Sequence, residues 1–124
     1  MYYIFNTILM EIEKDKPIWK QIVKEVKGRI VRKEIIRELP AVRAFAEEIR
    51  VNPNTVARAY RELEREGVVE SWVGRGTWVK EGVTEKLKEK MIKDAVDKFL
   101  RDLISIGLSK REIKKIVRDL YDRD

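Results

Sequence analysis

Asparagine, threonine and arginine side chains recur at helical spacing in one short stretch of the sequence. Asn54, Arg58, Arg61 and Arg65 fall on one side of a helix, with Thr55 beside them near its start. A helix about 10–12 Å across fits the major groove of duplex DNA, where arginine can bind guanine and asparagine can bind adenine. We therefore assign Asn54, Thr55 and Arg58 to base edges or nearby phosphates, and Arg61 and Arg65 to the DNA backbone.

An alternative for this stretch is a solvated helix face. The arginines could pair with Glu62, Glu64 and Glu66 at helical spacing, as they do on many charged helices. Two features favour the DNA interpretation instead. The acidic residues lie in the C-terminal half of the stretch, and the preceding "RVNPN" (50–54) has the short length of the turn in a helix-turn-helix.

Three helices are needed to position this face. The third begins after Asn52, a suitable N-cap, with Pro53 in the favoured first position, and runs to Gly67. The first two are predicted over 17–33 and 41–50. Their inward-facing residues recur at helical spacing: Ile18, Ile22, Val26 and Ile30 in the first, Val42, Phe45, Ala46 and Ile49 in the second, and Val56, Ala59, Tyr60 and Leu63 in the third.

A β-hairpin is predicted to follow, in "VVESWVGRGTWVKE" (68–81), with its turn at Gly74-Arg75-Gly76. A phosphate-binding loop is the weaker interpretation of this Gly-Arg-Gly. A three-residue loop would place Trp72 opposite Trp78 and Glu70 opposite Lys80. Trp78 is predicted to be a core residue, and Trp19 on the first helix is predicted to pack against its neighbours rather than to form a ligand platform. Three helices followed by a hairpin form a winged helix-turn-helix, predicted over residues 17–81.

Residues 82–124 are predicted to form two further helices that join two copies of the chain. The first ends near Gly107, and Ser109 to Glu112 fits a capping box for the second. Their apolar stripes exceed what a two-helix hairpin can bury: Leu87, Met91, Ala95, Phe99 and Leu103, then Ile113, Ile116 and Leu120. The alternative is that they fold back onto the winged domain. About forty residues leave little room for a pocket of about 300 Å³, so a small-molecule effector is doubtful.

The composition limits the other classes of function. The chain of 124 residues carries a formal charge of +6, which favours a polyanionic partner. It has no Cys and no His, and its carboxylates show no metal-ligand spacing, so we expect no enzyme, cofactor or metal site. Residues 1–16 are predicted to form an extended segment or a strand. We expect no signal peptide and no membrane segment, and hence a cytoplasmic protein.

The stretch "LPAVRAFAEEIRVNPNTVARAYRELEREGVVESWVGRGTWV" resembles the DNA-binding domain of the GntR family of bacterial transcription regulators. Its "NPNTV", the upstream "PIWKQI" and the two C-terminal helices resemble the short YtrA-type branch. The resemblance implies DNA contacts from Arg43, from Thr55 and Arg58, and from Arg75 and Gly76 at the wing tip. The chain departs from the family where Ala41 replaces a capping serine and where the Pro-Gly turn before Leu-Pro becomes "KEIIREL".

We therefore expect a mainly α protein with a small β-hairpin, a winged helix-turn-helix followed by a two-helix dimerisation region. The predicted function is a sequence-specific regulator, most often a repressor, that binds double-stranded DNA as a homodimer on an inverted-repeat operator. Two alternatives stay open. A winged-helix adapter would bind protein, and a DNA-coating protein would bind DNA with steep salt dependence but no sequence preference.

Overall fold

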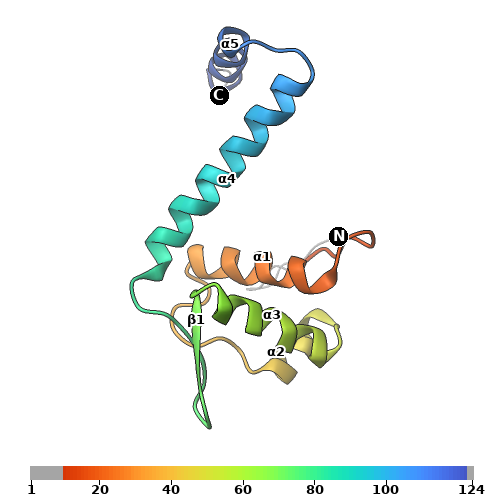
Figure 1. The fold of residues 1–124 in the computed structure, drawn as a ribbon, viewed down its shortest axis with the longest axis vertical. Helices are drawn as coiled ribbons and strands as arrows, with labels where there is room; N and C mark the ends of the chain where they lie inside the picture. Colours follow the sequence, from red (N-terminus) through yellow and green to blue (C-terminus); the bar gives the residue numbers. More distant parts are fainter. Residues whose placement is uncertain (1–9, 123–124) are drawn as a thin grey trace. The chain divides into compact units, whose positions relative to one another are not determined.

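The computed structural model describes residues 10–122, which form five helices and one two-stranded antiparallel sheet (Figure 1). They divide into two compact units inside α4: residues up to Leu87, here called the winged unit, and residues from Lys88 onward, the C-terminal unit. The elements in order are α1 (Ile18–Val31), α2 (Val42–Ile49), α3 (Pro53–Arg65), β1 (Val69–Trp72), β2 (Gly76–Val79), α4 (Val83–Ser105) and α5 (Lys110–Tyr121). The mainly helical winged fold is as predicted.

The predicted extended segment lies mostly outside the described residues. Its described part, 10–16, contains no helix or strand. Gln21 of α1 holds it in place, because the side-chain oxygen accepts from the Glu13 backbone amide at 2.7 Å and the side-chain nitrogen donates to the Glu13 carbonyl at 2.8 Å.

The core of the winged unit lies where α3 packs against α1 and α2. Each helix contributes one apolar stripe, as the helical spacing predicts, and the buried members are Ile22, Val26, Ile30, Phe45, Ala46, Ile49, Val56, Ala59, Tyr60 and Leu63. Ile18 and Val42, the first residues of α1 and α2, are the exceptions to the predicted stripes. Ile18 is 39% exposed, one turn before the buried Ile22, and Val42 is half-buried.

The turn between α2 and α3 is fixed by local backbone chemistry. Arg50 adopts a left-handed conformation (φ 57°) after α2, and the Val51 amide donates to the Ala46 carbonyl at 2.9 Å. Asn52 then caps α3, its side-chain oxygen accepting from the Asn54 amide at 2.7 Å, with Pro53 next. The predicted cap of α3 is confirmed, and the start of the candidate DNA-facing helix is held firmly.

The wing pairs in a different register from the predicted one. Trp72 lies opposite Gly76 and Glu70 opposite Trp78, so the expected Trp72–Trp78 and Glu70–Lys80 pairs are wrong. The loop does have three residues, but it begins at Val73. The Arg75 amide donates to the Trp72 carbonyl at 2.8 Å, which puts Gly74 (φ 73°) at the turn position that requires a positive φ.

A segment of the α1–α2 connection supports the wing from its other side. The Leu39 amide donates to the Thr77 carbonyl at 2.9 Å, and the Val79 amide donates to the Arg37 carbonyl at 2.6 Å. Trp78 is half-buried, and its indole nitrogen donates to the Arg75 carbonyl at 2.6 Å, which braces the turn. The wing is thereby anchored to the helical core along β2.

The two helices of the C-terminal unit are joined by a tightly defined connection. Gly107 (φ 94°) ends α4, where the Leu108 amide donates to the Leu103 carbonyl at 3.2 Å. Ser109 and Glu112 form the predicted capping box, with both reciprocal hydrogen bonds present at 3.2 and 3.0 Å. The hydrogen bond from the Ser109 backbone amide holds the pKa of Glu112 below its usual value, and the Ser109 hydroxyl has the same effect to a smaller extent. Both capping predictions for this connection are confirmed.

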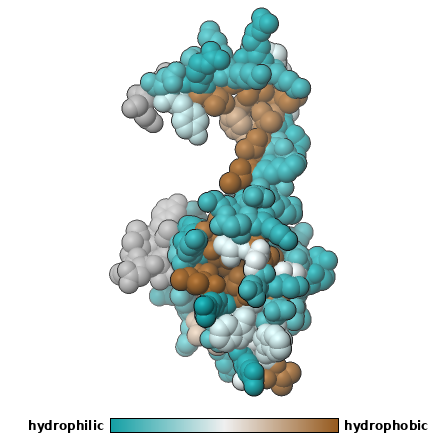
Figure 2. All heavy atoms as spheres, turned by 90° about the vertical axis from the view of Figure 1, so that its left-hand side faces the viewer, coloured by the Kyte–Doolittle hydropathy of each residue, from teal (hydrophilic) through white to brown (hydrophobic). Residues whose placement is uncertain are grey.

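An open apolar groove runs between α4 and α5 in the C-terminal unit. Its volume is about 930 Å³, so the expectation that this short region leaves little room for a hollow is wrong. The helices diverge enough to leave most of their apolar side chains uncovered, and the groove is lined mainly by Val96, Phe99, Leu100, Val117, Leu120 and Tyr121. Figure 2 shows hydrophobic residues gathered between these two helices, in the upper part of the view.

Candidate nucleic-acid interface

The exposed face of α3 carries several of the residues that were predicted to contact DNA. Asn54 and Arg61 lie two helical turns apart and are both exposed, while Thr55 is half-buried. Within residues 10–122, the side chain of Arg61 has no hydrogen bond or ion pair. Its guanidinium donors are therefore available to an external acceptor.

The acidic residues of α3 are occupied elsewhere. Glu62 accepts from Nε of Arg65 at 2.8 Å, and this contact lowers the pKa of Glu62. Glu64 accepts from the Ser71 amide at 3.3 Å, and Glu66 pairs with Lys27 of α1 at 2.6 Å. The solvated-face alternative thus describes Arg65 but not Arg61.

Arg58 has a different environment from Arg61. Its guanidinium lies over the ring of Trp19 in α1, with the central carbon 4.5 Å from the ring centroid. The flank of α3 that faces α1 carries both Arg58 and Glu66, which lie two turns apart, whereas Arg61 faces away from α1. Trp19 is half-buried, so it packs as predicted and also carries a cation.

Arg43 lies beside the start of α3, at the first turn of α2. It is exposed and has no ion pair among the described side chains. Together with Arg50, Val51 and Pro53 it lines a shallow hollow of about 540 Å³ between the two helices. Arg50 was not among the predicted contact residues, although its place in the "RVNPN" turn between two predicted helices marks it as a neighbour of the α3 N-terminus.

The wing tip presents one further cation. Arg75 is exposed, and its side chain has no partner in the described part of the chain. Gly76 has a requirement of its own, since a Cβ there would lie 2.8 Å from a carboxylate oxygen of Glu38, at a φ of 84° that disfavours other residues. The Glu38 side chain can move aside, so the positive φ is what favours glycine at this position.

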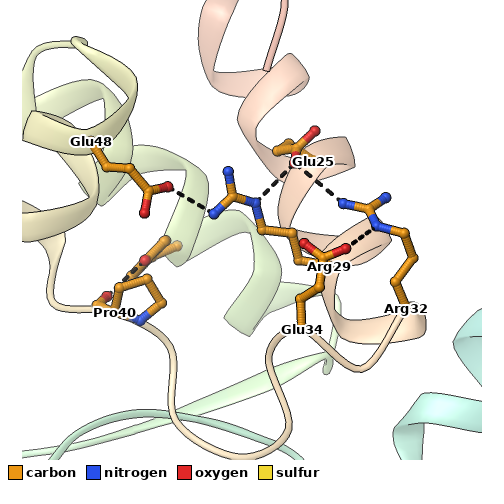
Figure 3. Close-up of polar contacts among 7 residues, drawn as sticks. Glu25, Arg29, Arg32, Glu34, Pro40 and Glu48 are labelled. Atoms are coloured by element: carbon orange, nitrogen blue, oxygen red, sulfur yellow. Dashed lines mark hydrogen bonds and ion pairs between the residues drawn. The ribbon is translucent and has the colours of Figure 1, made fainter. Parts of the chain in front are cut away.

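A buried arginine fixes α1 against α2 and so positions the whole face. Arg29 is 4% exposed; its Nε donates to Glu25 at 2.9 Å and its Nη1 to Glu48 of α2 at 2.8 Å (Figure 3). Burial alone would lower the pKa of Arg29, but the two carboxylates outweigh it and raise the pKa. The guanidinium also lies 5.0 Å from the ring centroid of Phe45.

A second buried contact fixes α3 to the start of α2. The Tyr60 hydroxyl donates to the Pro40 carbonyl at 2.8 Å, and burial raises the pKa of this phenol. Tyr60 was predicted as a core residue, whereas Arg29 was not predicted to have a structural role. The only signal for Arg29 was its position on α1, directly before the buried Ile30.

Metal sites and membrane-spanning helices are both absent from residues 10–122. These residues contain no group of three or more acidic side chains able to hold a metal ion. None of their helices is both long and apolar enough to span a bilayer.

Comparison with known proteins identifies the family. The family described as "Bacterial regulatory proteins, gntR family" matches residues 19–79. The HTH-type transcriptional regulator YhcF of Bacillus subtilis is 37% identical over 107 residues, covering 83% of this chain and 88% of YhcF. The HTH-type transcriptional repressor YtrA of the same organism is 36% identical over 110 residues, covering 84% of each chain.

The structural comparison agrees. A GntR family transcriptional regulator from Listeria monocytogenes has a TM-score of 0.80 and 30% identity, covering 87% of this chain and 98% of that one. The predicted family and fold class are thus confirmed, as is the resemblance to YtrA. The chain belongs to the GntR family of DNA-binding transcription regulators, and it is not an enzyme.

Proposed function

We propose that this chain is a repressor that binds an inverted-repeat operator in double-stranded DNA as a homodimer. The observation that carries the proposal is a pair of exposed surfaces, one in each unit. The winged unit exposes unpaired cations around α3, and the C-terminal unit exposes an apolar groove whose lining also includes Lys114 and Arg118. Cations around a recognition helix suit DNA, and an open apolar groove suits a second protein surface.

In this proposal α3 enters the major groove. Asn54 and Arg61, on its outward face, contact base edges or nearby phosphates, with Thr55 beside them. Arg43 contacts a backbone phosphate from the start of α2, and Arg75 approaches the minor groove from the wing. Support comes from the exposure of these cations and from the absence of carboxylate partners for them in residues 10–122.

The proposed subunit contact uses the groove between α4 and α5. Phe99, Ile116 and Leu120 are exposed, and we assign them to the contact together with the half-buried Met91 and Leu103 and the exposed Ala95. We no longer assign Leu87 and Ile113 to the subunit contact, because they are already buried within the single chain, at 6% and 4% exposure. Leu87 belongs to the winged unit, which explains its burial.

A second subunit suits the groove better than a small molecule does. The groove is open and mostly apolar, and two copies of the chain would each supply the same patch in a two-fold contact. A small-molecule effector stays doubtful in this proposal, since ligand sites enclose most of their ligand. Repression needs only occupancy of the operator, and the name of the YtrA relative supports this direction of regulation.

Selection of bound duplexes from a random DNA pool at near-physiological salt, followed by sequencing, tests the proposal. We expect a palindromic motif with half-sites about one helical turn apart. Enrichment of a single half-site would contradict the homodimer. Retention of DNA without any enriched motif would contradict the specific operator and favour a DNA-coating protein, and no retention would favour the adapter.

A further inference from the structure

Two cations and one indole meet where the first turn of α1 passes α3. The guanidinium carbon of Arg58 lies 4.5 Å from the ring centroid of Trp19, and the ammonium of Lys20 lies 5.6 Å from the same centroid. Both distances are within the range of a cation–π contact. Residues that are far apart in the sequence thus place two positive charges around one aromatic ring.

The stacking leaves the hydrogen-bond donors of Arg58 available. A guanidinium that lies over a ring uses its face, while its five N–H groups point outward in its plane. The carboxylate best placed to bind them is Glu62, one turn along α3, but Glu62 is bonded to Arg65. In the described part of the chain, neither Arg58 nor Lys20 forms an ion pair.

The indole also restricts the motion of Arg58. An exposed arginine loses side-chain entropy when it binds a ligand, and a guanidinium already held against a ring loses less. Arg61, on the outward face of the same helix, has no such support. Arg58 is therefore the more preorganised of the two donors, although it lies at the flank of the helix that faces α1.

We propose that Lys20 and Arg58 form a binding site for a backbone phosphate of the DNA duplex, and that Trp19 is the positioning residue for Arg58. The site lies across α1 and α3, and it rests on the proposed binding of α3 in the major groove. A phosphate suits it because cations from two helices lie against the same ring, one of them the compact point charge of a lysine. The contact is independent of base sequence.

The test compares six versions of this chain: the wild type, Lys20→Gln, Arg58→Gln, Trp19→Leu, Trp19→Phe and the double variant Trp19→Leu/Arg58→Gln. Lys93→Gln, which removes one positive charge from α4, serves as the charge-matched control. Affinity is measured over a range of salt concentrations for the selected operator and for a random duplex of the same length. Circular dichroism and the urea midpoint show whether each variant is folded.

We expect Lys20→Gln and Arg58→Gln each to reduce the slope of log affinity against log salt by about 1, on both duplexes alike. Trp19→Leu should weaken binding about two- to fivefold, and Trp19→Phe should restore most of the loss. Trp19→Leu added to Arg58→Gln should cause no further loss, because Trp19 acts through Arg58.

Several results would overturn the inference. A loss confined to one operator position in Arg58→Gln would make Arg58 a base contact. Additive losses from Trp19→Leu and Arg58→Gln would remove the positioning role, as would a lower urea midpoint with unchanged affinity. An equal loss in Lys93→Gln would indicate a general charge effect. If the wild type binds neither duplex, the proposed function fails as well, whereas wild-type behaviour in every variant overturns this inference alone.

Discussion

The winged unit and the C-terminal unit bury their apolar residues to very different extents. The winged unit closes its own core around Phe45, Val56 and Leu63. Among the described residues of the C-terminal unit, Ile113 is the only buried apolar side chain. Phe99 and Leu120 in the same unit are exposed. A similar apolar periodicity in the sequence thus yields a finished core in one unit and an open surface in the other.

The ion pairs differ between the units in the same way. In the winged unit, Arg29 joins α1 to α2 through two carboxylates and is almost fully buried. On α4 the ion pairs lie within the helix at i, i+4 spacing and are exposed: Lys90–Asp94, Lys93–Asp97 and Lys98–Asp102. Charges stabilise tertiary structure in the first unit, whereas in the second they support only one helix.

The largest expected effect on stability comes from replacing one phenylalanine in each unit by alanine. Phe45→Ala should lower the free energy of unfolding of the winged unit by about 3–5 kcal/mol, because it opens a cavity at a side chain that is 0% exposed. Phe99→Ala, at 43% exposure, should leave that unfolding free energy unchanged. Urea denaturation followed by circular dichroism measures both, and similar losses in the two variants would mean that the units share one core.

Removal of the buried cation should have the next largest effect. Arg29→Ala leaves Glu25 and Glu48 without their common partner and should cost about 3 kcal/mol of unfolding free energy. Lys93→Gln, which breaks an exposed pair on α4, should cause no measurable change. Thermal unfolding of the two variants at equal protein concentration makes the comparison. Equal stability of Arg29→Ala and the wild type would show that the buried network contributes nothing.

Within the winged unit, the two outer arginines of α3 should differ in DNA binding. Arg61→Ala should weaken operator binding by about 1–3 kcal/mol if it contacts a base, since its donors are unpaired. Arg65→Ala should have little effect, because Arg65 is bonded to Glu62. Fluorescence anisotropy with a labelled operator measures both affinities. A larger loss for Arg65→Ala would reverse the proposed orientation of α3.

The smallest expected effect concerns the caps of one helix in each unit. Ser109→Ala should cost about 1 kcal/mol of helix stability, because it removes the side-chain cap of α5. Ala41→Ser should stabilise α2 by a similar amount, because Ala41 supplies no side-chain hydrogen bond there. Hydrogen exchange of the first-turn amides measures each effect locally. Faster exchange of the first-turn amides of α2 in Ala41→Ser than in the wild type would contradict the expected stabilisation.

Local chemistry explains which features of the fold the sequence could predict. The cap at Asn52, the capping box at Ser109 and the turn at Gly107 each depend on a few neighbouring residues, and all three are present. The hairpin register could not be predicted, because Gly74 and Gly76 both adopt a positive φ and either could mark the turn. The hydrogen bond from the Arg75 amide to the Trp72 carbonyl places Gly74 in the turn itself.

Features that depend on tertiary contacts were missed or misplaced. Arg29 has an ordinary place in the α1 sequence, and only the approach of α2 gives it Glu48. Trp19 lies in α1 and Arg58 in α3, with α2 between them in the sequence, so their stacking follows from packing alone. Leu87 continues the apolar spacing of α4 yet is buried within the winged unit. Each case needs knowledge of which elements meet.

Sedimentation velocity of the wild type and Phe99→Glu, alone and with the selected operator, tests most directly that one unit binds DNA and the other joins two chains. A charge in the apolar groove should give a folded monomer, while the wild type should be a dimer that places two chains on one palindromic duplex. The monomer should keep its half-site preference and lose the tight binding to the full palindrome. A wild-type monomer, or a Phe99→Glu dimer that binds as tightly as the wild type, would contradict the account.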